Sequence, residues 1–413
     1  MKYYLLTFGC QMNKSDSERA AAVLENLGYQ KTDSEESADL IMVLACSVRQ
    51  SAIDRIYGRI KIWKKIKEKR PLITILTGCI LKEDKRKLIP HFDFIFPITD
   101  LVKLPEKLKN LPCQQIESYF HIHPHYQNNF QAYVPISTGC NNFCTYCVVP
   151  YVRGPEICRP AEEIINEVKE LIGRGYKEIC LLGQNVNSYF SNLNFPKLLK
   201  KINDIPGNFW LRFLTSHPKD FSDELIETMV KCKKICEYLH LPIQSGDNQI
   251  LKEMNRRYTV EHYKNIIEKI RKKIPDIAIS TDIIVGFPGE TEKQFQNTTK
   301  LMKEIKFDMA YIAEYSPRPQ TAAIKLNDNV PKKEKEKRRK ILTEILKQTA
   351  FEKNKKYLGQ IVEILVDSED KDNFYGKTRT FKTVKIKKSP FYQIGEFEKV
   401  KIISATPFGL AAS

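Results

Sequence analysis

The stretch GCNNFCTYCVVPYVRGPEICRP, residues 139–160, decides how the rest of the chain is interpreted. It carries Cys140, Cys144 and Cys147 with the spacing C-x3-C-x2-C. Thiolates are the soft ligands that iron–sulfur clusters prefer, so three of them on one short loop indicate a cubic cluster. Three protein ligands for four irons leave one iron open, and an open metal position is where a substrate or cofactor binds.

Zinc is the alternative for closely spaced cysteines. Structural zinc normally takes four protein ligands, and neither a second C-x2-C pair nor a pair of histidines lies close to this stretch. An isolated C-x2-C also arises by chance, but here a third cysteine precedes it, just after the apolar residues 133–136. The spacing therefore favours an iron–sulfur cluster.

The length of 413 residues predicts two or three domains with cores of their own. The sequence lacks the run of about 18 apolar residues that a membrane-spanning helix needs. Its first residues, MKYYLL, lack the pattern of a signal peptide. We therefore expect a cytoplasmic protein, in which eleven cysteines indicate metal or redox chemistry rather than disulfides.

The formal net charge of +17 suggests a polyanionic partner, with nucleic acid as the first candidate. A lysine-rich composition also occurs in proteins from A/T-biased genomes. Charge alone leaves the partner open.

The first hundred residues alternate between strand and helix patterns, which predicts a Rossmann-like parallel sheet. The expected strands are 3–8, 39–44 and 72–76, and the expected helices are 15–27 and 50–70. Cys10, Cys46 and Cys79 each fall just past the carboxyl end of one strand, and such ends share one edge of a parallel sheet. Buried cysteines acting as small apolar residues are the alternative. Three at equivalent positions favour a second, auxiliary cluster, again with an open iron.

Residues 97 to about 131 lack clear periodicity and are expected to form a linker, whose His121, His123 and His125 receive no role. Strand and helix patterns then alternate again. The expected strands are 133–137, 178–182, 210–214, 237–241, 277–284 and 307–314, and helices are expected to begin near 160, 196, 222, 248 (continuing past 259) and 291. These units predict a partial (β/α)6 barrel of the TIM type, open on one side, with the cluster loop at its carboxyl-end rim.

Polar or glycine-rich stretches follow several of these strands at the same rim. They are GQNVN (183–187), TSHP (215–218), PIQSG (242–246) and GFPGE (286–290). Together with the cluster loop they are expected to line a ligand cavity.

The last part of the chain changes pattern. Residues 331–340 hold seven Lys or Arg against two Glu and open a helix expected to reach about 357; such a run is usually a solvated face. Strand patterns at 361–366, 373–377, 383–386 and 397–403 predict a small antiparallel barrel. Basic and aromatic side chains alternate there, a surface suited to nucleic acid. They are Phe374, Tyr375, Lys377, Arg379, Phe381, Lys382, Lys385 and Lys387.

The cluster stretch resembles the radical SAM enzymes and, through Gly139, Thr145, Tyr146, Val148 and Gly154, their methylthiotransferase branch. The motifs GCQMN (9–13) and CSVR (46–49) resemble the N-terminal domain of that family, and the last residues resemble its TRAM domain. The resemblance implies three domains. They are a methylthiotransferase N-terminal domain with the auxiliary cluster (1–115), a radical SAM core (126–356) and a TRAM RNA-binding domain (357–413).

Two [4Fe–4S] clusters and S-adenosylmethionine (SAM) are the implied cofactors. By resemblance, Cys140, Cys144 and Cys147 hold the catalytic cluster that binds and reductively cleaves SAM. Cys10, Cys46 and Cys79 hold the auxiliary cluster, which supplies sulfur. Tyr146 is expected near the adenine of SAM, and polar contacts to the cofactor are expected from Asn185, Ser216, Gln244, Arg256 and Asp282.

The motifs GCQMN, CVVPY (147–151), TSHP and LHLP (239–242) resemble the MiaB-type branch. This implies insertion of sulfur and a methyl group at carbon 2 of isopentenyl-adenosine at position 37 of tRNA, with an electron donor and a sulfur or iron–sulfur supply protein as further partners and no membrane. The alternatives are threonylcarbamoyl-adenosine tRNA, a ribosomal protein, or a non-catalytic iron–sulfur RNA-binding protein. No role is assigned to Cys113, Cys158, Cys180, Cys232 and Cys236.

Overall fold

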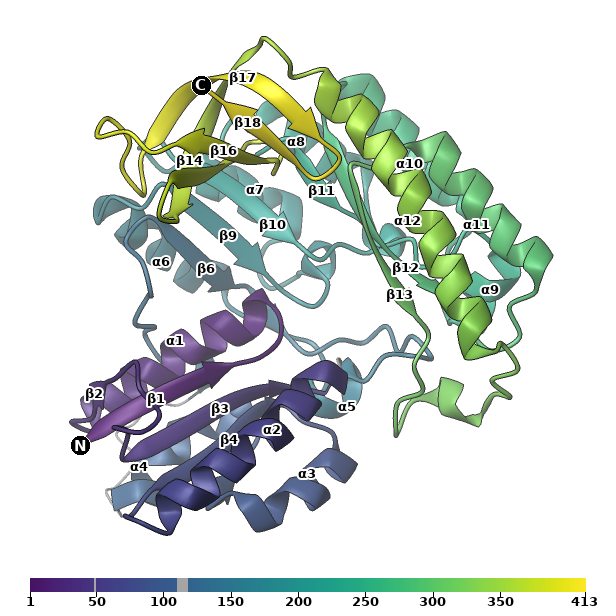
Figure 1. Cartoon of the computed structure of the whole chain (residues 1–413). Helices are drawn as coiled ribbons and strands as arrows, with labels where there is room; N and C mark the ends of the chain where they lie inside the picture. Colours follow the sequence, from purple (N-terminus) through teal and green to yellow (C-terminus); the bar gives the residue numbers. More distant parts are fainter. Residues whose placement is uncertain (48–49, 110–117) are drawn as a thin grey trace.

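The computed structural model describes residues 1–47, 50–109 and 118–413, so Cys113 and the last two residues of the CSVR motif lie outside the described part. Figure 1 shows the N-terminal domain in purple and blue on one side of the central teal and green domain, with the yellow C-terminal barrel on the other side. No helix in the described ranges is long and apolar enough to span a membrane.

The N-terminal domain is a parallel sheet with the strand order β2-β1-β3-β4-β5. Its strands are β1 (Lys2–Thr7), β2 (Gln30–Lys31), β3 (Leu40–Cys46), β4 (Ile73–Cys79) and β5 (Phe94–Ile95). Its helices are α1 (Gln11–Asn26), α2 (Gln50–Lys67), α3 (Lys82–Leu88) and α4 (Leu104–Lys109), with short turns η1 (Ile89–His91), η2 (Ile98–Lys103) and η3 (Tyr119–His121).

Strand β3 has the sequence LIMVLAC and is buried along its whole length. Leu40, Met42 and Leu44 pack in one core with α1, whereas Ile41 and Val43 pack in a second core with α2. A strand that is apolar on both faces is typical of a parallel sheet covered by helices on both sides. The predicted Rossmann-like sheet is confirmed.

Two details of this domain were predicted wrongly. Helix α1 begins at Gln11, directly after Cys10, and not at residue 15, because the polar residues of its first turns pack against the rest of the protein instead of facing solvent. The predicted linker from residue 97 contains η2 and α4, and its apolar side chains complete the core beside α1. Those side chains are Ile98, Leu101, Leu104, Tyr119 and Ile122.

The central domain has six main parallel strands in two sheets, β6-β9-β10 and β11-β12-β13. Their bounds are β6 (Gln131–Pro135), β9 (Glu178–Leu182), β10 (Trp210–Leu214), β11 (Tyr238–His240), β12 (Ala278–Val285) and β13 (Met309–Glu314). A parallel bridge between Leu211 and Ile235 joins the sheets near β10 and β11. Among the described strands β6 and β13 do not pair, so the predicted partial barrel with one open side is confirmed.

Helices and short elements surround the two sheets. They are β7 (Ser137–Thr138), α5 (Val149–Arg153), β8 (Ile157–Cys158), α6 (Ala161–Gly173), η4 (Val186–Ser188), α7 (Phe195–Asn203), η5 (Pro218–Asp220), α8 (Asp223–Lys231), α9 (Asn248–Glu253), α10 (Val260–Lys273), α11 (Glu292–Ile305) and η6 (Ala322–Lys325). The single helix expected from residue 248 is two helices. Asn255 between them adopts a positive φ of 56°, and Thr259 starts a new helix by accepting a hydrogen bond from the amide of His262.

The C-terminal part begins with the long helix α12 (Lys332–Lys355), which packs against β13 and α11. It continues into a closed barrel with the order β14-β15-β16-β18-β17. The strands are β14 (Ile361–Glu369), β15 (Asn373–Thr378), β16 (Thr383–Lys387), β17 (Phe397–Thr406) and β18 (Gly409–Ala412). The predicted barrel is confirmed, but β18 was missed, and its pairing with β16 is parallel, so the barrel is not purely antiparallel.

Candidate active site

The cluster loop after β7 is shaped by its own backbone. Gly139 has φ +77°, and a Cβ there would lie 1.9 Å from the carbonyl oxygen of Pro155. The amide of Cys140 donates to the carbonyl of Gly154 (3.2 Å). Only glycine fits so close an approach in this backbone region. The loop is therefore closed by contacts between its own residues.

Helix α9 and the turn after it hold the other side of this loop. The amide of Thr145 donates to the carbonyl of Met254 (3.1 Å), and its hydroxyl donates to the carbonyl of Glu253 (2.8 Å). The side-chain amide of Asn255 donates to the carbonyl of Phe143 (2.9 Å). These bonds fix the segment that carries the second and third cysteines.

The three cysteines of the loop are partly buried and electrostatically coupled. Burial, together with the neighbouring thiols of Cys144 and Cys140, raises the pKa of Cys147 to about 12, against the opposing charge of Arg256. Within the described ranges no three His, Cys, Asp or Glu side chains converge on a single metal ion. Three partly buried thiols on one loop fit a multi-iron cluster, in which each cysteine ligates a different iron.

A cavity of about 810 Å³ opens beside the third cysteine of the loop. It brings together four residues that the sequence predicted for this site: Tyr146, Cys147, Gln244 and Asp282. The remaining wall is mostly apolar and comes from β12, β13, α12 and the turn before β18. It includes Ile283, Ile284, Met309, Ala310, Ile312, Ala313, Leu346 and Phe408.

Arg256 lies beside the cluster loop and not in the cavity wall. Its guanidinium donates to the sulfur of Cys144 (3.5 Å), the carbonyl of Pro242 (2.7 Å) and the hydroxyl of Tyr258 (2.7 Å). The guanidinium is buried, and these hydrogen bonds hold it next to the Cys144 thiol. The structure thus gives Arg256 a contact with a cysteine sulfur, which the sequence did not indicate.

Asn185 and Ser216 sit at the rim, after β9 and β10, outside the lining of the cavity. The side-chain amide of Asn185 donates to Asp220 (2.7 Å), but its Oδ1 is buried without a hydrogen-bond partner in the described part of the chain, and so is the hydroxyl of Ser216. Buried polar atoms normally have partners. Such atoms at the rim of a cofactor site fit a polar ligand such as SAM.

His217 next to this rim was not singled out by the sequence. Burial, with the nearby charges of Arg256 and Lys219, lowers the pKa of His217 to about 2. Its Nδ1 accepts from the amide of Lys219 (3.2 Å), and its ring packs edge-on against Tyr258. The TSHP motif was the only signal, because burial beside Arg256 depends on the fold.

Cys10, Cys46 and Cys79 meet at one edge of the N-terminal sheet. Cys46 and Cys79 are the last residues of β3 and β4 and face each other in register, while Cys10 caps α1 after β1. Burial, together with the nearby thiols of Cys46 and Cys10, raises the pKa of the Cys79 thiol to about 12, against the opposing charge of Arg153. The structure places the three cysteines at the same sheet edge, although two of them lie within their strands and not beyond them. Their role as ligands stays a prediction.

Asn13 holds this edge together. Its side-chain amide donates to the carbonyls of Phe8 (2.7 Å) and Ala45 (2.9 Å), which precede Cys10 and Cys46. Three thiols at one sheet edge, of which Cys46 and Cys79 are buried and Cys10 is exposed, fit a second cluster with an open side.

The alternating basic and aromatic residues of the C-terminal barrel divide into two groups. Arg379 pairs with Glu237, Lys382 pairs with Asp308, and Phe381 stacks on Tyr238 with ring centroids 4.7 Å apart. These three residues dock the barrel on the central domain, so the prediction that they face nucleic acid is wrong. Phe374 is buried in the barrel core, whereas Lys385 and Lys387 are exposed.

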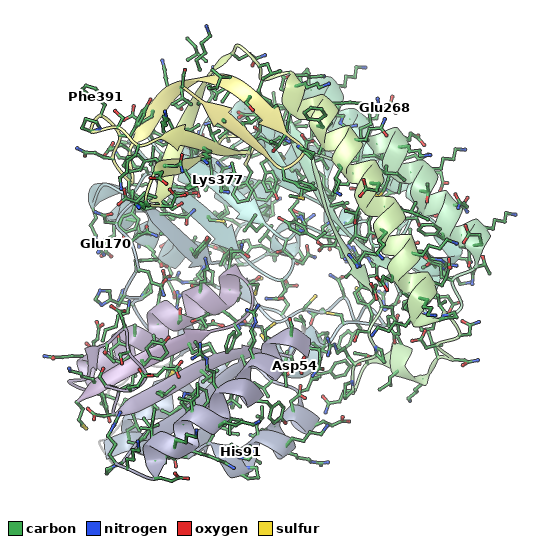
Figure 2. All side chains as sticks on the ribbon, in the orientation of Figure 1. Asp54, His91, Glu170, Glu268, Lys377 and Phe391 are labelled. Atoms are coloured by element: carbon green, nitrogen blue, oxygen red, sulfur yellow. The ribbon has the colours of Figure 1, made fainter. Side chains whose placement is uncertain are left out.

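The barrel has two distinct sides. Figure 2 shows Lys377 where the barrel meets the central domain and Phe391 at the opposite, outer edge. The charge run of 331–340 is not a purely solvated face either, because Lys335 and Arg338 are buried in ion pairs with Asp328 and Glu290.

Comparisons with known families divide the chain in the same order as the fold. Residues 2–97 match the uncharacterized protein family UPF0004, residues 134–302 the radical SAM superfamily, and residues 355–413 the TRAM domain.

Curated relatives match along nearly the whole chain. The tRNA-2-methylthio-N(6)-dimethylallyladenosine synthase of Clostridium botulinum (strain Langeland) is 45% identical, over 99% of this chain and 96% of its own length. Relatives with the same name from Finegoldia magna and a Thermoanaerobacter species are 42% and 45% identical and are covered over 93% and 86% of their lengths. The chain belongs to this synthase family. The resemblance inferred from the cluster motifs is confirmed.

Solved structures support the fold alone. The radical SAM methyltransferase TsrM from Kitasatospora setae has a TM-score of 0.56 at 13% identity, over 78% of this chain and 76% of that chain. The cobalamin-dependent SAM radical enzyme OxsB has a TM-score of 0.51 at 11% identity, over 84% of this chain and 56% of that chain. Both agree with the radical SAM architecture that family membership gives this enzyme.

Proposed function

We propose that this synthase family member inserts sulfur and a methyl group at carbon 2 of isopentenyl-adenosine at position 37 of tRNA. One observation carries the proposal. The chain matches 96% of the length of a relative named for this reaction and carries two separate cysteine triplets. An unactivated aromatic C–H bond requires cofactor chemistry that side chains do not supply.

Cys140, Cys144 and Cys147 would hold a [4Fe–4S] cluster. Such a cluster would supply the one electron needed for reductive cleavage of SAM. Tyr146 and Gln244 line the adjoining cavity, where we place the cofactor's adenosine, and Asp282 lines the same wall. Asn185 and Ser216 offer their unpartnered oxygens to its polar groups, and Arg256 holds Cys144 in place.

Cys10, Cys46 and Cys79 would hold the auxiliary cluster, from which the inserted sulfur comes, and a second SAM would give the methyl group. Burial keeps water from Cys46 and Cys79, and Asn13 fixes the backbone just before Cys10 and Cys46. An electron donor and a sulfur or iron–sulfur supply protein are needed to complete and repeat the reaction. We place the protein in the cytoplasm.

The apolar wall of the cavity supports the choice of a prenylated base. Ile283, Met309, Ile312, Leu346 and Phe408 present hydrocarbon surface, which favours a dimethylallyl chain over the charged threonylcarbamoyl group. The anticodon loop is single-stranded, so extrusion of its base costs only a few kcal/mol. Exposed lysines of the barrel, including Lys385 and Lys387, would bind the RNA backbone.

These roles divide the chain into a methylthiotransferase N-terminal domain (1–115), a radical SAM core (126–356) and a TRAM RNA-binding domain (357–413). The family matches to residues 2–97, 134–302 and 355–413 support this division.

The test is an anaerobic assay of the reconstituted protein with anticodon stem–loops that carry prenylated, threonylcarbamoylated or unmodified adenosine at position 37. Mass spectrometry should find the methylthio product only with the prenylated loop. A product only with the threonylcarbamoylated loop would show that this loop is the substrate instead. SAM cleavage without product from any loop would contradict the assignment of tRNA as the substrate.

A paired substitution tests the apolar wall. Phe408→Ala removes barrel surface from the cavity and should raise KM for the prenylated loop by about tenfold, corresponding to roughly 1.4 kcal/mol of lost burial. Phe391→Ala is the matched control, because Phe391 is 85% exposed on the outer edge of the same barrel. Equal effects of the two changes would exclude the cavity as the site of the prenyl group.

A further inference from the structure

Arg153 links the two cysteine triplets. It ends α5, on the same loop as the first triplet and six positions after Cys147, yet its side chain lies in the N-terminal domain. There its Nε donates to the sulfur of Cys79 (2.9 Å), and its Nη2 donates to Asp16 (2.5 Å) and to Oδ1 of Asn13 (3.2 Å). One side chain therefore connects the loop of one triplet to a cysteine of the other.

The hydrogen bonding of this guanidinium is incomplete, because one of its donors lacks a partner among the described residues. The side chain is 1% exposed, and its Nη1 is buried without a hydrogen-bond partner in the described part of the chain. A buried charge costs several kcal/mol unless it is paired and all its donors are satisfied. Asp16 neutralises the charge, but one donor remains open on a group that already touches a cysteine sulfur.

The first triplet shows the same arrangement. Arg256 is buried and donates to the sulfur of Cys144 (3.5 Å). In each site a buried arginine thus contacts one of three thiols. Hydrogen bonds to cysteine sulfurs are one of the means by which proteins set the reduction potential of iron–sulfur clusters.

We propose that Arg153 is a positioning residue for the auxiliary cluster. It donates to the Cys79 thiolate, keeps a second donor available to the sulfur of the cluster, and holds the N-terminal sheet edge against the loop of the first triplet. The inference rests on the proposed role of Cys10, Cys46 and Cys79 as cluster ligands. Its consequence is an auxiliary cluster with a higher reduction potential than the same cysteines alone would give, because a donor to a thiolate stabilises the reduced, more negative state.

The experiment isolates the auxiliary cluster in a chain that carries Cys140→Ala, Cys144→Ala and Cys147→Ala. Into it are introduced Arg153→Gln and, separately, Arg153→Lys, which keeps the charge but not the planar set of donors. Arg338→Lys is the matched control, since Arg338 is also buried in an ion pair, but with Glu290 and far along the chain on α12. The readouts are iron per chain, the midpoint potential from a redox titration, and the EPR spectrum.

The parent and the control should hold about four irons per chain with one common midpoint potential. Both Arg153 variants should show a lower potential and an altered EPR spectrum, or lose iron while circular dichroism stays that of a folded chain. Four irons with an unchanged potential and spectrum in Arg153→Lys would overturn the role of Arg153. Absence of iron from the folded parent would instead overturn the auxiliary cluster, and this inference with it, so the two failures are distinguishable. If Arg153→Gln does not fold, Arg153→Lys carries the test.

Discussion

The two cysteine triplets are built in opposite ways. Cys140, Cys144 and Cys147 lie on one loop whose shape comes from its own backbone, through Gly139 and the bond between Cys140 and Gly154. Cys10, Cys46 and Cys79 come from three strands and meet only because β1, β3 and β4 are neighbours in the sheet. The shape of the loop site therefore depends on a few neighbouring residues. The shape of the sheet site depends on the packing of all three segments that carry its cysteines.

The two sites also differ in how their surroundings hold them. The loop is clamped by α9 of its own domain through Thr145. The sheet site is completed by Arg153 from the other domain. The chemistry that we propose to need both clusters thus depends on the contact between domains, and the predictions that follow test each half of this comparison.

The largest effect is expected from removal of each triplet in turn. With Cys140, Cys144 and Cys147 changed to Ala, formation of 5′-deoxyadenosine should fall to background. The cluster would be lost, and no side chain can carry out its chemistry. With Cys10, Cys46 and Cys79 changed to Ala, SAM cleavage should continue while the methylthio product disappears. Chromatography of the nucleosides and iron analysis measure both.

The iron content sharpens this result. The wild type should hold about eight irons per chain and each triple variant about four. Full methylthio product from the chain without Cys10, Cys46 and Cys79 would show that the sulfur has another source.

Two glycine-to-alanine substitutions, each of which adds a single Cβ, should impair the two cysteine sites separately. Gly139→Ala places a Cβ 1.9 Å from the carbonyl oxygen of Pro155, and Gly78→Ala places one 2.6 Å from that of Ala45, each at a positive φ. The backbone strain alone costs about 1–2 kcal/mol, to which the clash adds. Gly139→Ala should lose SAM cleavage, and Gly78→Ala should lose only sulfur insertion.

Gly58→Ala is the control for this pair. Gly58 lies in α2, and its added Cβ meets nothing within 4 Å. The change should stabilise the protein by about 0.4–1 kcal/mol in urea unfolding and leave both activities unchanged. The comparison of local loop and assembled sheet would be contradicted by loss of SAM cleavage in Gly78→Ala.

A smaller effect is expected from Asn13→Ala. It leaves the carbonyls of Phe8 and Ala45 without their side-chain donor in a buried site, at a cost of about 1–3 kcal/mol. Urea unfolding should show this loss, and the share of iron bound by Cys10, Cys46 and Cys79 should fall. Asn26→Ala, at the exposed end of the same helix, should change neither; an equal loss in both would remove the special role of Asn13.

The last effect is a change in stability that is expected only at acid pH and comes from the central domain. Because the pKa of His217 is lowered to about 2 in the folded protein, the unfolded chain binds this proton below pH 6.5 and the folded chain does not. Folding stability therefore falls as the pH falls, by about 2 kcal/mol at pH 5. His217→Gln should remove this part of the slope in denaturant titrations at pH 7.5 and pH 5; an unchanged slope would show that His217 is protonated in the fold.

Much of the fold could be predicted because its signals are local. Glu178–Leu182 and Trp210–Leu214 are strands with the predicted bounds, since apolar runs between helical patterns mark buried parallel strands. Strand β18 was missed because Gly409–Ala412 is short and small, and it is a strand only through its neighbours β16 and β17.

The candidate site divides in the same way. Cys140, Cys144 and Cys147 could be found from spacing, and Cys10, Cys46 and Cys79 from their equivalent positions after three strands. The contacts of Arg153 and Arg256 with cysteine sulfurs could not, because each arginine reaches a cysteine distant in the chain. The docking role of Arg379, Phe381 and Lys382 was hidden for the same reason.

The sequence by itself determined which residues carry thiols, which segments form the main parallel strands, and the spacing of the first triplet, because these depend on residue type and on neighbours along the chain. Only the tertiary structure decided that Arg153 contacts Cys79, that Phe408 reaches the cavity, and which basic residues of the barrel remain exposed. Such contacts join distant segments. They form where burial of apolar surface brings those segments together, and the spacing of residues along the chain does not predict which segments will meet.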